Sequence, residues 1–146
     1  MLSQRARYAL KALLNIARAG AGPQGVSTIS EQENIPRKFL ETIMGELRRG
    51  GLVTATRGNA GGYRLARPAD LITFADVLRA TDGPIAMLPC VSRNFYERCE
   101  DCTDEATCAL RRTFSEVRDA VNAVLEHRTL AAAIADEADV AAAASA

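Results

Sequence analysis

The sequence is poor in several residue types and patterns that mark common functions. It has no tryptophan, only 5% aromatic residues and a single histidine, His127, among 146 residues. No stretch approaches the roughly 18 consecutive apolar residues of a membrane-spanning helix, and the first residues lack the apolar core of a signal peptide. We therefore expect a cytoplasmic protein without a membrane partner, whose thiols stay reduced. Because no Ser/His/Asp set or pair of carboxylates stands out, we do not expect an enzyme.

The chain also lacks a net charge, because 18 basic residues balance 18 acidic ones. Taken alone, this balance argues against a generally basic nucleic-acid binder. The two halves differ strongly, however. Residues 1–67 carry 11 basic and four acidic side chains, a net charge of +7, whereas residues 68–146 carry seven and 14, a net charge of −7. This difference in charge between the two halves predicts that one half binds an anionic partner.

The order of elements expected in the basic half is that of a winged helix-turn-helix. Apolar spacing and helix-end signals predict helices over residues 3–19, 28–33 and 36–49, followed by a β-hairpin with strands over 52–56 and 63–66. Ser27 is the expected N-cap of the short helix. The predicted fold is mostly α with this small hairpin, and residues 1–67 form the DNA-binding region.

This fold predicts which side chains meet double-stranded DNA. The start of the third helix enters the major groove, the Gly-rich tip of the hairpin reaches the minor groove, and the polar face of the first helix meets phosphates. The predicted contacts are Arg5, Arg7, Ser27, Thr28, Pro36, Arg37, Lys38, Glu41, Thr42, Arg57, Gly58, Gly61 and Tyr63.

The acidic half divides into four segments. A connecting segment over 68–83 contains a short helix with Thr73 and Asp76 as its capping box. Residues 84–105 form a cysteine-rich loop of little periodicity. Residues 106–137 hold a long helix and a short Ala-rich one, and residues 138–146 are expected to be a flexible tail.

Four cysteines, Cys90, Cys99, Cys102 and Cys108, lie within nineteen residues of this half. In a reducing compartment such a group indicates metal ligands or redox thiols rather than disulfides. Thiolates favour an iron–sulfur cluster or zinc. Structural zinc usually has two short Cys pairs, and only Cys99 and Cys102 form one, so the spacing leaves cluster and zinc both open.

The long helix carries an apolar seam at intervals of four, three, four and three residues, formed by Leu110, Phe114, Val117, Val121 and Val124. A seam with this heptad spacing is typical of a coiled-coil interface, although a simple core-facing stripe has the same pattern. We expect a homodimer, because two recognition helices related by a two-fold axis read a pseudo-palindromic operator.

Three sequence runs resemble bacterial transcriptional regulators of the IscR/NsrR/RirA type. They are Arg7-Tyr8-Ala9-Leu10-Lys11-Ala12-Leu13, Phe39-Leu40-Glu41 with Leu47-Arg48-Arg49-Gly50-Gly51-Leu52-Val53, and Thr56-Arg57-Gly58-Asn59-Ala60-Gly61-Gly62-Tyr63-Arg64-Leu65-Ala66. The resemblance covers roughly residues 1–135. It implies homodimeric winged-helix repressors or activators with an iron–sulfur cluster in each subunit, the recognition helix at 36–49 and the wing arginine at Arg57.

The cysteine pattern departs from this family. Its members mostly have three cysteines with a final interval of five residues, which Cys102 and Cys108 match; Cys90 is then the first ligand and Cys99 is extra. Arg111 stands where the IscR branch has a histidine, and Tyr8 lies near the aspartate of the NsrR branch. Ligation by all four thiols is therefore simplest, and a [2Fe–2S] cluster is favoured over [4Fe–4S].

The sequence thus predicts a DNA-binding regulator whose affinity is set by a cluster that senses iron, redox state or nitric oxide. The alternatives are a zinc-stabilised regulator, a regulator switched by thiol oxidation, and a thiol redox enzyme that uses Cys99 and Cys102. His127 is expected at the surface near a helix C-terminus rather than as a ligand.

Overall fold

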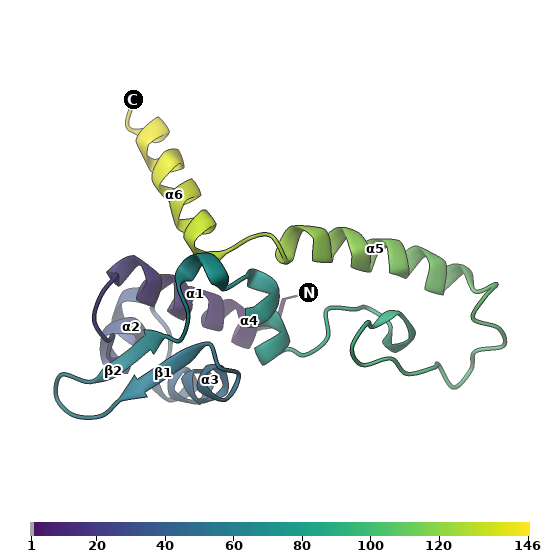
Figure 1. Cartoon of the computed structure of the whole chain (residues 1–146), viewed down its shortest axis with the longest axis horizontal. Coiled ribbons are helices and arrows are strands. Elements are labelled where there is room, and N and C mark those ends of the chain that lie inside the picture. Colours follow the sequence, from purple (N-terminus) through teal and green to yellow (C-terminus); the bar gives the residue numbers. More distant parts are fainter. Residues whose placement is uncertain (1) are drawn as a thin grey trace.

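A computed structural model describes residues 2–146 as a helical body from which two arms extend (Figure 1). The body contains α1 (Gln4–Ala19), α2 (Val26–Glu33), α3 (Arg37–Arg49), the hairpin of β1 (Val53–Thr56) and β2 (Gly62–Leu65), the 3-10 turn η1 (Ala69–Leu71) and α4 (Phe74–Thr81). One arm holds the cysteine-rich loop with the turn η2 (Pro89–Val91) and α5 (Ala109–Leu125), and the other is α6 (Leu130–Ala144). This arrangement confirms the winged helix-turn-helix fold.

The core lies between α1, α3 and α4. Leu13 and Ile16 of α1 and Ile43 and Leu47 of α3 are fully or almost fully buried. Tyr8 also packs against the core and meets Phe39 of α3 edge to face, with 5.7 Å between the ring centroids. These contacts fix α3 against α1, so the exposed face of α3 has a defined direction.

The helix ends follow local capping chemistry, with one correction. Ser3 caps α1 by accepting a hydrogen bond from the Ala6 N–H, and Asn34 ends α2 in the left-handed conformation at φ 53°. The N-cap of α2 is Gly25, however, so the prediction of Ser27 was wrong and Ser27 lies inside the helix. Gly25 has an extended backbone and its carbonyl accepts from the Ile29 N–H, so the chain enters α2 two residues earlier than expected.

The hairpin is antiparallel and pairs Val53 with Leu65 and Thr56 with Gly62. Gly62 has φ 149°, and a Cβ on it would lie 2.5 Å from the Gln24 carbonyl oxygen. A Cβ on Gly61 would lie 2.1 Å from the Thr56 carbonyl oxygen. At Gly61 and Gly62 two backbone segments lie so close together that a side chain would clash, so only glycine fits at these positions.

Helices α5 and α6 are attached to the body through the start of α4. The N–H of Leu130 donates to the Ile72 carbonyl, and the N–H of Phe74 donates to the Arg128 carbonyl, both at 2.9 Å. Thr73 and Asp76 form the predicted capping box of α4. Helix α5 begins at Ala109, three residues later than expected, because Cys108 is its N-cap.

The last helix is longer than predicted and includes most of the segment that we expected to be a tail, residues 138–146. Helix α6 continues to Ala144, which agrees with the high helix propensity of its alanines. Both oxygens of Glu137 accept hydrogen bonds from Arg18 of α1, and Asp136 pairs with Arg128. Among the helices of residues 2–146, none combines the length and hydrophobicity that crossing a bilayer demands.

Candidate DNA-binding surface and cysteine pocket

Helix α3 turns a polar face to solvent at its N-terminal end. Pro36 is its N-cap, and Arg37, Lys38, Glu41 and Thr42 are all exposed. Arg37 pairs with Glu41 one turn later at 3.1 Å. The opposite face is buried in the core, so this exposed face is the one available to a partner. Ser27 and Thr28 of α2 are exposed as well, as expected for residues that flank a recognition helix.

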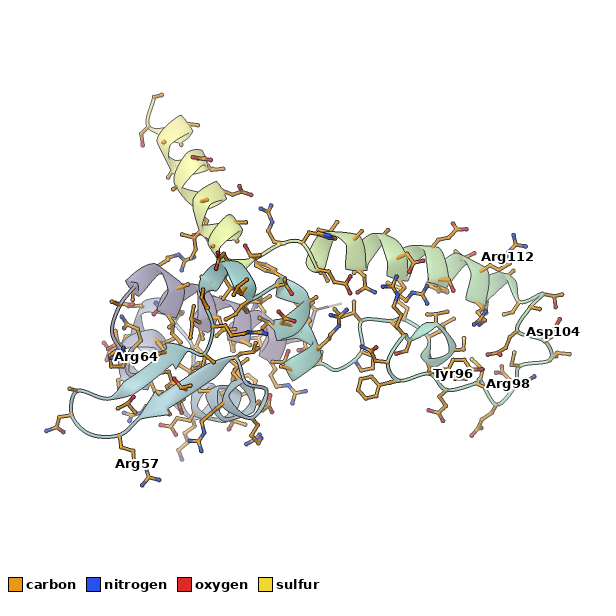
Figure 2. All side chains as sticks on the ribbon, in the orientation of Figure 1. Arg57, Arg64, Tyr96, Arg98, Asp104 and Arg112 are labelled. Carbon is orange, nitrogen blue, oxygen red and sulfur yellow. The ribbon has the colours of Figure 1, made fainter. Side chains whose placement is uncertain are left out.

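The wing carries Arg57 at its edge, where the side chain extends away from the body (Figure 2). Gly58 is exposed beside it and has φ 103°, a conformation that favours glycine. Two other predicted wing contacts also have a place in the structure of the wing. Gly61 lies in the tight turn described above, and Tyr63 packs against the core while its backbone pairs with Gln24. Tyr63 therefore anchors the wing to the body.

Arg5, a predicted phosphate contact, has partners within the chain. Its guanidinium pairs with Glu46 of α3 at 3.3 Å and donates to the Thr81 carbonyl at the end of α4 at 2.8 Å. Arg5 thus links three helices. Arg7, by contrast, is exposed, bonded to Gln4 and positioned over the Tyr8 ring, so it is still available to a phosphate.

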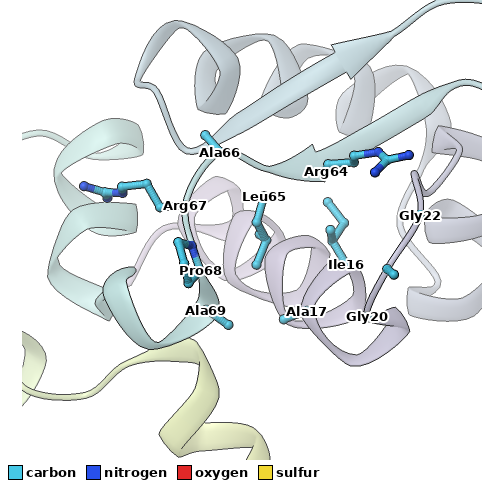
Figure 3. A pocket seen from close by; sticks show the side chains of 11 residues that line it. Ile16, Ala17, Gly20, Gly22, Arg64, Leu65, Ala66, Arg67, Pro68 and Ala69 are labelled. Atoms are coloured by element: carbon cyan, nitrogen blue, oxygen red, sulfur yellow. The ribbon is translucent and has the colours of Figure 1, made fainter.

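A cavity of about 470 Å³ lies between the C-terminal end of α1 and β2 (Figure 3). Small and apolar side chains form most of its wall, and Arg64 and Arg67 contribute the basic groups. It belongs to the base of the wing and is separate from the cysteines.

The four cysteines line a second cavity, of about 480 Å³, between the loop and the first turn of α5. All four are free thiols, with Cys90 buried and the other three half-buried. The other lining residues include Asp101, Asp104 and Arg111. The structure therefore brings together every predicted metal ligand around one space.

The environment of each thiol follows from the local backbone. Cys108 is the N-cap of α5, and its Sγ accepts a hydrogen bond from the Arg111 N–H at 3.5 Å, so the positive end of the helix dipole points at this sulfur. Hydrogen bonding to Cys90 raises the pKa of the Cys99 thiol above its ordinary value of 9.0, and burial and nearby negative charge add to this. Cys90 and Cys99 line the same cavity.

The first part of the loop is fastened to α5. Arg118 donates to the Val91 carbonyl at 2.6 Å, and Arg93 pairs with Asp119 at 2.8 Å. Hydrogen bonds from Arg118 and Arg93 hold the pKa of the Asp119 carboxyl below its ordinary value. Cys90, directly before Val91, is therefore held against the helix.

The second part of the loop is held mainly by its own short-range bonds. Tyr96 donates to Glu105 at 2.6 Å, which raises the pKa of the Tyr96 phenol, and Arg98 donates to the Cys102 carbonyl at 3.1 Å. Bonds from Thr107 and the Ala106 N–H lower the pKa of Asp104. This part contains Cys99 and Cys102. Its links to the rest of the arm are the bond from the Glu97 N–H to the Pro89 carbonyl at 3.3 Å and the Arg111–Glu105 pair at 3.8 Å.

The donor set fits an iron–sulfur cluster by its chemistry, because four soft thiol ligands surround one roomy cavity. Within residues 2–146, no three His, Cys, Asp or Glu side chains are placed closely enough to hold a single metal ion. Binding would therefore draw the loop thiols inward. His127 is exposed, with its Nδ1 2.8 Å from the Ala123 carbonyl oxygen, as predicted for a surface residue.

Helix α5 presents part of its apolar seam to solvent. Leu110 is 63% exposed, Val124 is 65% exposed and Val121 is 37% exposed. Phe114 is half-buried, and Val117 faces Ile85 and Met87 across a small pocket. Large apolar side chains exposed along one helix are typical of an interface with another chain.

Helix α5 is also joined to α4 by an ion pair between Arg79 and Glu126 at 2.5 Å. The hydrogen bond from Arg79 is the main reason that the pKa of Glu126 lies below its ordinary value of 4.5. Sequence reasoning missed this pair and Arg118, because their partners lie in other elements. It noted Arg111 only as the residue that stands in place of a family histidine, and did not foresee that Arg111 lines the cavity.

Comparison with protein families matches residues 2–136 to Rrf2, described as an iron-dependent transcriptional regulator. The rrf2-like HTH-type transcriptional regulator of Rhodobacter capsulatus is 42% identical over 121 residues, which cover 80% of this chain and 81% of that protein. The HTH-type transcriptional regulator CymR of Bacillus subtilis is 32% identical over 130 residues, which cover 88% of this chain and 86% of that one.

Two solved structures share the fold. CymR, the global cysteine regulator of B. subtilis, superposes with a TM-score of 0.74 at 33% identity, covering 90% of this chain and 94% of that one. T. potens IscR superposes with a TM-score of 0.74 at 25% identity, covering 94% and 88% respectively.

Proposed function

The chain belongs to the Rrf2 family of transcriptional regulators, which bind DNA and are not enzymes, and we propose that it is a homodimer whose affinity for its operator is set by an iron–sulfur cluster. The observation that carries the proposal is the convergence of four free thiols on one cavity at the N-terminus of α5. We place its action in the cytoplasm, where thiols stay reduced.

The DNA-binding face in this proposal is formed by α3 and the wing. The exposed N-terminal residues of α3, Arg37 and Lys38 foremost, reach the major groove, and Arg57 reaches the minor groove beside it. Arg7, Ser27 and Thr28 contact phosphates. The net charge of +7 in residues 1–67 supports this orientation, since the −7 half is repelled by the DNA backbone.

The dimer forms through the exposed seam of α5. Leu110, Val121 and Val124 lose their contact with water when a second copy of α5 packs against them. A two-fold axis then places two recognition helices on the half-sites of a pseudo-palindromic operator.

Cys90, Cys99, Cys102 and Cys108 hold the cluster, and [2Fe–2S] is the type that four protein thiolates satisfy most simply. When bound, the cluster supplies one-electron redox chemistry and a reactive target for oxidants and nitric oxide. The residues of the chain hold and orient the cluster. Cys108 provides a sulfur that the helix dipole stabilises as an anion, and the second part of the loop brings Cys99 and Cys102 toward it.

A contact route connects this pocket to α3. Arg118 and the Arg93–Asp119 pair attach the Cys90 segment to α5, and the Arg79–Glu126 pair attaches α5 to α4. Arg5 then bridges the end of α4 to Glu46 of α3. A change in loop position at Cys90 thereby biases the position of α5 and α3, and a coupling of about 1–3 kcal/mol changes operator affinity about 5–150-fold.

A thiol-based regulator without a cluster is the second candidate. It is favoured by the four unpaired thiols and by the likeness to CymR, which has also been solved as an oxidised form from Staphylococcus aureus at 30% identity. In this case oxidation of the thiols, rather than cluster loss, changes the loop.

Anaerobic purification followed by iron, sulfide and zinc analysis and an absorption spectrum tests the proposed cofactor. We expect a red-brown protein with iron and acid-labile sulfide in equal amounts. A variant with Cys102→Ser and Cys108→Ser is the matched control and should be colourless. A colourless wild-type protein that binds one zinc per chain, or no metal, would rule out the cluster.

A further inference from the structure

Arg111 combines two unusual features at the cysteine pocket. Its Nε is fully buried and has no hydrogen-bond partner, although its side chain as a whole is partly exposed. It also lines the cavity that contains the four thiols. A buried guanidinium N–H without an acceptor costs stability, and an acceptor bound in the adjoining pocket would remove this cost.

The charges of the residues around the cavity indicate that a bound acceptor would be an anion. Among the described residues that line this space, Arg111 is the only one with a positive charge, whereas Asp101 and Asp104 are negative. Four cysteine thiolates around a divalent metal carry two net negative charges, and an iron–sulfur cluster held by four thiolates is also an anion. The pocket without Arg111 would therefore surround an anion with further negative charge.

Arg111 has two neighbours beside the pocket, one through its backbone and one through its side chain. Its backbone N–H is bonded to Cys108, and its Nε lies 3.8 Å from Glu105, which is itself bonded to Tyr96. The distance to Glu105 is too long for a hydrogen bond. The Arg111 side chain therefore lines the same cavity as the four sulfurs, and its Nε makes no hydrogen bond to the Glu105 carboxylate.

We propose that Arg111 is a positioning residue that neutralises and hydrogen-bonds the anionic thiolate–metal centre in this pocket. It favours the assembled centre over the open loop and sets the reduction potential of a cluster. The effect of Arg111 on the reduction potential rests on the proposed function, because it requires a bound cluster. The charge effect itself applies to any divalent metal gathered by the four thiols.

The first experiment measures Co²⁺ binding to the reduced apoprotein by thiolate-to-cobalt absorption. We expect Arg111→Gln to weaken Co²⁺ binding about five- to tenfold and Arg111→Lys to stay within about twofold of wild type, because lysine keeps the charge. Arg112→Gln is the matched control: it removes the same charge one residue away, from a side chain that points away from the loop (Figure 2).

A second variant separates charge from a merely structural role. If Arg111 acted only by holding Glu105, then Glu105→Gln would weaken Co²⁺ binding in the same way as Arg111→Gln. If Arg111 acts by its charge, Glu105→Gln removes a nearby negative charge and strengthens binding. In the reconstituted cluster, Arg111→Gln should lower the reduction potential relative to both wild type and Arg112→Gln.

The outcomes of the two arms are distinguishable. If the wild type forms no cluster, the proposed function fails, and the Co²⁺ arm still decides the role of Arg111. Equal Co²⁺ affinity in Arg111→Gln and Arg112→Gln, parallel losses in Arg111→Gln and Glu105→Gln, or no Co²⁺ binding by the wild type would each overturn the inference.

Discussion

The guanidinium of Arg118 donates a hydrogen bond of 2.6 Å to the carbonyl oxygen of Val91, the residue directly after Cys90. The Arg118 side chain is only 18% exposed, so this bond is largely shielded from water. It joins the most buried cysteine of the pocket to the middle of α5, the helix that we propose as the dimer interface. This hydrogen bond therefore connects the cysteine-rich loop directly to α5.

We predict that Arg118→Gln uncouples the cluster from DNA binding. The four thiols remain, so the cluster content measured by iron and sulfide analysis should be unchanged. The ratio of operator affinities with and without the cluster should fall toward one, and the protein should lose about 1–2 kcal/mol of unfolding free energy. Arg112→Gln should behave like wild type. An unaltered affinity ratio in Arg118→Gln would exclude the contact route described above.

Arg57 provides the test of the wing. We predict that Arg57→Ala weakens binding to every DNA sequence by a similar factor and reduces the slope of log affinity against log salt by about 0.9, because one phosphate-region charge contact is lost. Fluorescence anisotropy over a series of salt concentrations measures both quantities. Arg112→Ala, with the same change of charge on α5, should leave the slope as it is. Equal slopes in wild type and Arg57→Ala would place the wing away from DNA.

The exposed seam of α5 predicts the oligomeric state. Val124→Asp places a charge where two apolar surfaces meet, and we expect the dimer dissociation constant to rise at least about 100-fold. Analytical ultracentrifugation measures it. Val140→Asp on α6 is the control, because Val140 is 69% exposed and Val124 is 65% exposed. A dimer that survives Val124→Asp but is lost in Val140→Asp would move the interface to α6.

The Arg79–Glu126 pair predicts a pH dependence of stability. Arg79 keeps the pKa of Glu126 below its ordinary value of 4.5 in the folded protein. The pair therefore stabilises the fold at pH values above 4.5, and this contribution is lost as the pH falls through the lowered pKa. Urea unfolding should show a stability gap between wild type and Glu126→Gln that is constant near neutral pH and shrinks in acid. Glu116→Gln, an exposed change on α5, should show no such gap.

Much of the fold could be predicted from local signals. Apolar spacing located α1, α3 and the hairpin, and the Thr73–Asp76 capping box was recognisable as a sequence pattern. The end of α6 was not predictable in this way. We expected a short last helix that ends near residue 137, whereas α6 continues to Ala144. Its residue Glu137 is bound by Arg18, more than a hundred positions earlier in the chain.

The site shows the same division between local and distant contacts. The exposed residues at the start of α3 and the four cysteines follow from sequence spacing alone. Arg5 was assigned to DNA because it lies off the apolar stripe of α1, yet its partners Glu46 and Thr81 lie 41 and 76 residues away. Periodicity describes one helix at a time and carries no information on which distant acid or carbonyl meets its polar face.

Cluster-dependent DNA binding is tested most directly by the affinity for one operator fragment, which the protein selects from a random DNA library. The affinity is measured anaerobically with and without the cluster at the same salt concentration. We predict that the two forms differ by at least about fivefold, and that the difference disappears in the Cys102→Ser, Cys108→Ser variant, which cannot hold the cluster. Equal affinity of the iron-loaded and iron-free wild-type protein would contradict it.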